Sequence, residues 1–225
     1  MKKYLLILFS LFSLALWGQS DSVLITKNFK FQDGVYLSFA AFQKNQPDYS
    51  WDEAEGRMVT NADTYVSKIE WLRVTNGETK RHLPFPKVWG VCIGGIPFIK
   101  TPVQYPDYVL FAALRVRGKL CYFSYEEEAI EQVVISAYNP LTGRPFRSGK
   151  VSNKVYHHQE KMIDFEQGTI VDFNPTNFLD LIKDDPKLSA SVRDLSEEEA
   201  QEKLFKSLLI YVDRNPVYVL TDKTQ

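Results

Sequence analysis

A pair of adjacent glycines in the middle of the chain constrains its fold more than any other feature. Gly94-Gly95 separates two β-prone runs, Val88–Ile93 and Ile96–Ile99. A two-residue hairpin turn needs positive φ angles, which glycine adopts without a clash of a Cβ atom. The pattern predicts a tight β-hairpin in one of the most apolar parts of the chain.

Similar turn signals recur on both sides of this hairpin. Asn76-Gly77, Arg117-Gly118 and Gln167-Gly168 each lie between β-prone runs, and we expect positive φ at Gly77, Gly95 and Gly118. The runs are Val66–Val74 with Glu78–Leu83, Tyr108–Val116 with Leu120–Tyr125, and Met162–Phe165 with Thr169–Phe173. Residues 66–173 are therefore predicted to form an antiparallel meander of about 8–10 short strands, open or partly closed.

Polar segments interrupt this pattern and predict loops. Asp48–Thr64 is the best candidate for a mobile loop, and the acidic run Glu126-Glu127-Glu128 for a solvated one. Gln132–Tyr138 is predicted to be a strand that ends in a turn at residues 139–143. Arg144–Tyr156 is basic and has no regular pattern.

Helices are expected at both ends of the meander. Ser38 can cap a short helix that carries Phe39 and Phe42 on one face. The C-terminal segment, residues 174–215, contains an Asn174-Pro175 helix start, a short helix at Pro186–Asp194 and a Ser196/Glu199 capping box. The fold class predicted is α+β, with residues 21–225 as a single domain.

The two ends of that domain are less regular. Ser22–Phe31 is expected to be an edge strand or a loose lead-in, and Val217–Leu220 a strand that rejoins an edge of the sheet.

The first twenty residues resemble an export signal. Lys2-Lys3 precedes an uncharged apolar run, residues 4–17, followed by Gly18-Gln19-Ser20. This order is typical of a cleaved signal peptide, and the run is shorter than the roughly 18 residues that span a bilayer. An uncleaved membrane anchor is the alternative. No cysteine follows the run, so the sequence predicts a secreted or periplasmic protein without a lipid anchor or stable membrane insertion.

Charge and cysteine content exclude several classes of partner and site. Loss of the two leader lysines takes the formal net charge from −1 to −3, too weak to indicate a nucleic acid partner. Cys92 and Cys121 are the only cysteines, and both fall within predicted strands that a meander would not pair. Two buried free thiols are expected, with a disulfide as the alternative.

Three passages together resemble a family. They are GVYLSFAAFQKNQP (residues 34–47), VWGVCIGGIPFI (88–99) and MIDFEQGTIVDFNPTNFLDLIKDDPKL (162–188). In this order they are similar to uncharacterised exported proteins of Bacteroidetes. The resemblance covers most of the mature chain but implies no activity. Gly94-Gly95 departs from it, because an Asp-Gly or Asn-Gly turn is expected there.

The sequence contains no recognisable catalytic motif. No nucleophile elbow, phosphate-binding glycine loop or zinc spacing is present, and the only histidines are His82, His157 and His158. His157-His158 with Glu160 and Asp164 could hold a metal, but adjacent histidines on a strand point to opposite faces. We therefore assign no catalytic, cofactor-binding or metal-binding residue and no cofactor.

The function expected is an exported, non-enzymatic module that binds or scaffolds an envelope protein or a glycan. The alternative is a small hydrolase whose acid pair forms only in three dimensions, since carboxylate separation cannot be read from a sequence.

Overall fold

Antiparallel strands dominate the computed structural model, which describes residues 21–77 and 79–221. Four short α-helices accompany them, so the predicted α+β class is confirmed. The predicted leader, residues 1–20, lies outside the described residues. Among the described residues, no helix combines the length and apolar character that crossing a membrane requires.

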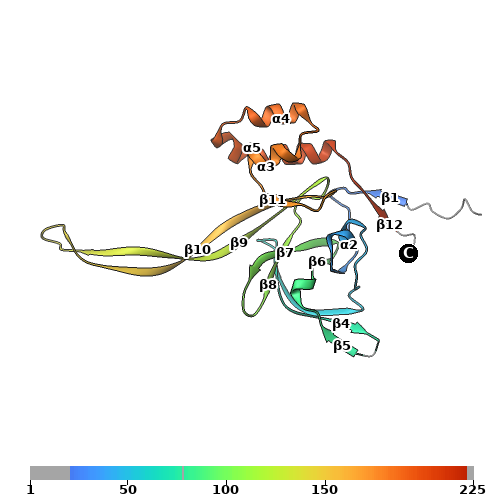
Figure 1. Cartoon of the computed structure of the whole chain (residues 1–225), viewed down its shortest axis with the longest axis horizontal. Coiled ribbons are helices and arrows are strands. Elements are labelled where there is room, and N and C mark those ends of the chain that lie inside the picture. The colour runs from blue at the N-terminus through green and yellow to red at the C-terminus, as the bar shows by residue number, and fades with distance from the viewer. Residues whose placement is uncertain (1–20, 78, 222–225) are drawn as a thin grey trace, which may run out of the picture.

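Seven strands form the largest sheet, at the centre of Figure 1. Their order is β2-β6-β7-β8-β4-β3, and β5 also pairs with β4. They are β2 (Gly34–Tyr36), β3 (Ala54–Asn61), β4 (Val66–Asn76), β5 (Thr79–His82), β6 (Gly90–Ile93), β7 (Ile96–Gln104) and β8 (Val109–Ala113).

This strand order differs from that of a simple meander. β4 pairs with β8, with Val66 opposite Ala112, and β6–β7 lies on the other side of β8. Every residue of β8 is buried, so this strand fits only in the interior of the sheet, where both of its faces are covered. The prediction of a loop at Asp48–Thr64 is also wrong, because Ala54–Asn61 within it forms β3, which pairs with β4.

The predicted tight turns form as expected at two of three sites. Gly94 and Gly95 have φ of 62° and 79°, and Gly77 has φ of 65°. Gly118 lies outside the positive-φ region, so the prediction for that residue is wrong. Tyr108–Val116 likewise forms a shorter strand than predicted: β8 ends at Ala113, and Val116 forms an isolated bridge with Tyr122.

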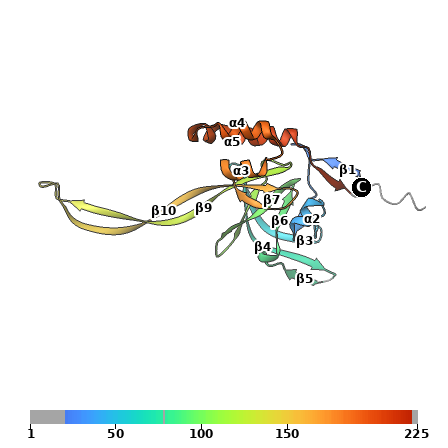
Figure 2. The same ribbon diagram turned by 45° about the horizontal axis from the view of Figure 1, so that its top comes forward.

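A second sheet carries the most unusual element of the molecule. β9 (Leu120–Tyr138) pairs along its whole length with β10 (Pro145–Asp164), and β11 (Ile170–Asp172) pairs only with the end of β10. Figures 1 and 2 show β9 and β10 leaving the body of the molecule as a long two-stranded ribbon. The predicted loop at Glu126–Glu128 and the irregular Arg144–Tyr156 are both parts of these strands, which corrects the prediction.

The C-terminal helices pack on one face of this second sheet near Leu120 and Tyr122, on the upper side of Figure 1. The short α2 (Phe39–Gln43) is capped by Ser38 as predicted, and Ser196 and Glu199 form the predicted capping box of α5. The C-terminal helices are α3 (Pro175–Leu181), α4 (Pro186–Arg193) and α5 (Glu197–Arg214); a 3₁₀ turn, η1, spans Phe85–Lys87. The terminal strands β1 (Asp21–Leu24) and β12 (Tyr218–Thr221) pair with each other as a separate sheet, not with an edge of the larger one.

The buried root of β9 joins two apolar clusters. Cys121, Phe123 and Tyr125 pack with α2 residues in one cluster, whereas Leu120 and Tyr122 pack with the C-terminal helices in another. The alternation follows from the pleat, which sends successive side chains to opposite faces. Both cysteines are free and buried, as predicted, so the alternative of a disulfide is wrong. The ribbon beyond Tyr125 is anchored by this doubly covered root.

Candidate functional site

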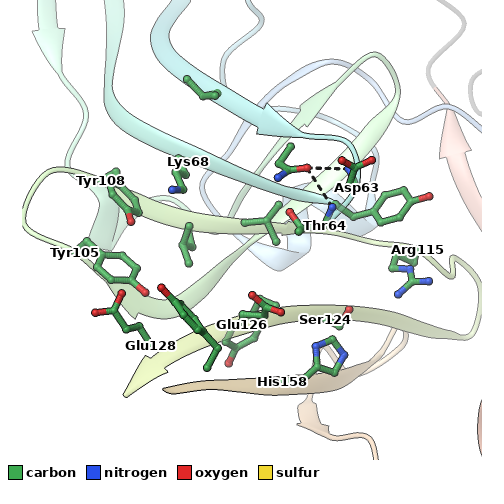
Figure 3. Close-up of a pocket in the computed structure, with 17 residues that line it drawn as sticks. Asp63, Thr64, Lys68, Tyr105, Tyr108, Arg115, Ser124, Glu126, Glu128 and His158 are labelled. Carbon is green, nitrogen blue, oxygen red and sulfur yellow. Dashed lines mark hydrogen bonds between the residues drawn. The ribbon is translucent and has the colours of Figure 1, made fainter. Parts of the chain in front are cut away.

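A cavity large enough for a small ligand lies where the ribbon leaves the body of the molecule. It has a volume of about 590 Å³ and is shown in Figure 3. Its walls come from the β3–β4 turn, the β7–β8 connection, Arg115 and the start of the β9–β10 ribbon. Five tyrosines line this tyrosine pocket: Tyr65, Tyr105, Tyr108, Tyr125 and Tyr156.

Aromatic rings and cations alternate around the pocket. The rings of Tyr105 and Tyr108 lie 4.7 Å apart at 31°, and Lys68 Nζ lies 4.9 Å from the Tyr108 ring centre. The Arg115 guanidinium lies 5.2 Å from the Tyr65 ring centre. These cations are therefore attracted to ring faces inside the protein, which holds the pocket walls in place. Burial raises the pKa of Tyr105, so its hydroxyl remains a neutral hydrogen-bonding group at physiological pH.

The β3–β4 turn presents Tyr65 to the pocket through an unusual backbone conformation. Asn61 Oδ1 accepts hydrogen bonds from the backbone N–H groups of Asp63 and Thr64, at 2.8 and 3.3 Å (Figure 3). Tyr65 then has φ of 56°, a region that a bulky side chain rarely occupies. Its carbonyl accepts a hydrogen bond from the Ala113 N–H at 2.8 Å, which offsets part of the strain.

Three carboxylates also line the pocket, and they bear on the hydrolase alternative. Asp63 comes from the β3–β4 turn, and Glu126 and Glu128 occupy alternate positions of β9. Glu128 forms an ion pair with Lys154 at 2.7 Å. Tertiary structure thus brings together acids that the sequence separates, as that alternative requires.

A tyrosine–glutamate pair lies beside Arg115, one of the residues that line the pocket. The hydroxyl of Tyr122 donates to Glu160 Oε1, and Arg115 also lies 5.9 Å from the Tyr122 ring centre. Burial, followed by this hydrogen bond, raises the pKa of Tyr122. Tyr122 therefore stays protonated and serves as a support for Arg115.

The histidines are placed apart, as strand geometry predicts. His157 is opposite Glu127 and His158 is opposite Glu126, on alternate faces of the ribbon, and only His158 lines the pocket. Asp164 accepts from the N–H groups of Glu166 and Gln167 and so closes the β10–β11 turn. Within the described part of the chain, no group of three or more His, Cys, Asp or Glu side chains is arranged to hold a metal ion.

A second cavity, of about 630 Å³, lies between the β1 segment and α5. The Arg117 guanidinium beside it donates to the carbonyls of Lys27 and Phe29, at 2.7 and 2.9 Å. Burial lowers the pKa of Arg117. Because this guanidinium already ties the N-terminal segment to the sheet, we assign Arg117 a structural role.

The tyrosine pocket was not predicted from the sequence. Its residues fall between 59 and 158 and share no spacing, and Tyr105 and Tyr108 resemble ordinary turn aromatics. The one signal in the sequence was the high tyrosine content, 12 in the chain. Searches of protein-family models, curated proteins and solved structures find no match to this chain.

Proposed function

We propose that the protein is an exported, non-enzymatic binding module of the cell envelope, and that the tyrosine pocket holds a neutral saccharide. Export is supported by Lys2-Lys3 and the short apolar run at residues 4–17. The observation that carries the ligand proposal is the convergence of five tyrosines, from segments far apart in sequence, on one cavity.

The size and charge of the pocket support a neutral, polar ligand. Its volume falls within the range of roughly 300–1,000 Å³ typical of small-molecule sites. Lys68 and Arg115 face three carboxylates, so neither a strong anion nor a strong cation would meet a uniform field. A sugar ring has an apolar C–H face that stacks on tyrosine and hydroxyls that bond to carboxylates and guanidinium groups.

Calorimetric titration with oligosaccharides prepared from the producing cell's envelope tests the ligand class. We expect the Tyr105→Ala/Tyr108→Ala variant to bind about tenfold or more weakly, because each aromatic contact is worth roughly 0.5–1.5 kcal/mol. Tyr218→Ala is the matched control, since Tyr218 is exposed on β12, away from the pocket. Equal loss of binding in both variants, or no saccharide binding by the wild type, would contradict the proposal.

A protein ligand is the other partner class to be tested. Affinity capture from the native envelope, with and without excess saccharide, separates the two. A protein whose capture survives both the saccharide and the Tyr105→Ala/Tyr108→Ala change would replace the saccharide as the ligand. Mass spectrometry of the same native sample should find an N-terminus near Gly18–Asp21, whereas an intact Met1 would contradict export with cleavage.

A saccharide hydrolase remains a second candidate because Asp63, Glu126 and Glu128 line the same pocket. The carboxylate of Glu128 contacts Lys154 Nζ at 2.7 Å, an engagement that a general acid reaching a glycosidic oxygen could not keep. We expect no release of reducing ends from bound saccharide. Release that is abolished by Glu126→Gln, with binding retained, would make the protein a hydrolase.

A further inference from the structure

The ribbon of β9 and β10 extends far from the rest of the molecule (Figures 1 and 2). We call residues 126–158 the arm; its β9 strand, at about 3.3 Å per residue, extends roughly 40 Å from the root. Exposed apolar side chains occur on both of its faces: Val134 and Tyr138 on the even-numbered face, Val133 and Ile135 on the odd-numbered one. Charged side chains also occur on both, so a contact along either face would bury charge as well.

The arm ends in a closed turn that holds one leucine in water. Leu141, in this turn, is 93% exposed. Its N–H donates to Asn139 Oδ1 at 2.9 Å, and the Gly143 N–H donates to the Asn139 carbonyl at 2.8 Å. The Asn139 N–H donates to the Arg144 carbonyl at 2.9 Å, and Pro140 has no N–H to satisfy. Because these backbone groups are already paired, the turn can leave water at a lower cost than an open loop.

The outer part of the arm, residues 132–152, carries only positive charge. It contains Arg144, Arg147 and Lys150 and no acid, a formal charge of +3, and all three of these residues are exposed. The rest of the chain from residue 21 onwards has a formal charge of −6 with histidines neutral. An anionic surface therefore attracts the outer arm and repels the remainder of the molecule, which favours an end-on approach.

We propose that the tip of the arm, residues 138–147, docks reversibly and end-on on an anionic phospholipid surface. Leu141 enters the boundary between headgroups and acyl chains, where an apolar side chain is favoured. The exposed ring of Tyr138 lies beside the turn, and tyrosine suits this boundary because it has an apolar body and a polar end. Arg144 and Arg147 bind lipid phosphates, which guanidinium groups engage through paired hydrogen bonds. The contact is peripheral, because one leucine and a few cations do not anchor a protein permanently.

In this arrangement the arm is a spacer between the membrane and the tyrosine pocket. Glu126 and Glu128 line the pocket at the root, roughly 40 Å along β9 from the tip. The ion pair of Glu128 with Lys154, at 2.7 Å, joins the two strands where the arm begins. The lipid contact does not depend on what the pocket binds, since the tip and the pocket share no residue.

Co-sedimentation with phospholipid vesicles tests the charged part of the contact. The mature protein, without the predicted leader, should bind vesicles containing phosphatidylglycerol more tightly than pure phosphatidylcholine, and added salt should reduce the difference. Arg144→Gln/Arg147→Gln should weaken binding roughly 30-fold, because each basic residue near an anionic surface contributes about a factor of five. Arg144→Lys/Arg147→Lys keeps both charges and should retain most of the binding. Lys187→Gln/Arg193→Gln, which removes two exposed cations from α4, is the matched control and should bind like the wild type.

Two single changes on the arm test the apolar part. Leu141→Ser should weaken vesicle binding about tenfold, because a buried leucine is replaced by a polar residue. Ile130→Ser should leave binding unchanged, since Ile130 is 68% exposed but lies about 25 Å nearer the root than Tyr138. A wild type that does not bind anionic vesicles, or an equal loss in these two variants, would overturn the proposal. Capture of an envelope protein that Leu141→Ser abolishes, without vesicle binding, would assign the tip to a protein partner instead.

Discussion

A Cβ atom on Gly118 would lie 2.4 Å from Cγ1 of Val212, on helix α5. Gly118 lies in the turn that the bridge between Val116 and Tyr122 closes, where the chain enters β9, and α5 packs directly on this backbone. Glycine is required here by the absence of a side chain, because its φ is not in the left-handed region. The close approach fixes α5 against the root of the arm.

Gly118→Ala should therefore destabilise the fold by about 1–3 kcal/mol, the usual cost of overpacking. The added Val212→Ala change removes the clashing methyl groups and should recover part of that loss. Gly149→Ala is the control, because a Cβ on Gly149 would point into open space, with no contact inside 4 Å. Urea unfolding of the wild type, Gly118→Ala, Val212→Ala and the double variant measures the coupling. Strictly additive effects would mean that Gly118 and Val212 do not interact.

The ion pair between Lys119 and Asp184 should contribute stability over a defined pH range. Lys119 Nζ lies 2.6 Å from Asp184 Oδ2, and Tyr211 donates to the other carboxylate oxygen at 2.8 Å. The hydrogen bond to Asp184 raises the pKa of Lys119 to about 12, and burial opposes it. For Asp184, burial raises the pKa, but the hydrogen bonds from Lys119 and Tyr211 outweigh it and leave the pKa below 3.8.

The sign of the pH dependence follows from these shifts. A lowered carboxylate pKa stabilises the fold above the ordinary value of 3.8, and that stability is lost as pH falls through the folded-state pKa. A raised lysine pKa stabilises it below 10.5, and this is lost as pH rises towards about 12. Asp184→Asn should lower the urea midpoint at neutral pH and flatten the decline in acid. An unchanged acid limb would show that Asp184 does not contribute.

Cys92 and Cys121 should be unreactive towards thiol reagents in the folded protein. Burial raises the pKa of both thiols, that of Cys121 to about 12, so little thiolate forms at physiological pH. Iodoacetamide labelling followed by mass spectrometry should modify neither residue until denaturant is added, and then both. Fast labelling of one cysteine in native buffer would show that its strand opens locally.

Tyr65 is expected to lower the stability of the fold while it contributes to saccharide binding. Its φ of 56° is strained for tyrosine but tolerated by asparagine, so Tyr65→Asn should hold or raise the thermal midpoint. The same change removes the ring that contacts Arg115 and should weaken saccharide binding. Tyr156→Asn, in ordinary strand geometry, is the comparison. A lower thermal midpoint in Tyr65→Asn alone would mean that packing of the ring outweighs the backbone strain.

The sequence by itself determined the features whose causes lie within a few residues. Gly94-Gly95 turns the β6–β7 hairpin because positive φ is a property of those two residues. The capping box of α5 forms because Ser196 and Glu199 satisfy each other's backbone N–H groups three positions apart. Tertiary structure contributes to the Gly94-Gly95 turn as well. Asp33 accepts hydrogen bonds from the N–H groups of Gly94 and Gly95, at 3.0 and 2.7 Å. Its carboxylate comes from a distant part of the chain, whereas an Asp-Gly turn would supply one locally.

Tertiary structure alone decided the strand order, the arm and the pocket. Glu126–Glu128 resembles a loop because acidic residues disfavour strands, yet the buried root from Leu120 to Tyr125 directs them into β9. β4 pairs with β8, although other strands have a similar apolar pattern. A short stretch of sequence does not show which of these strands β4 will pair with, because the choice depends on how all of them pack. The tyrosine pocket follows from that pairing, since the β3–β4 turn meets the arm only when β4 lies beside β8.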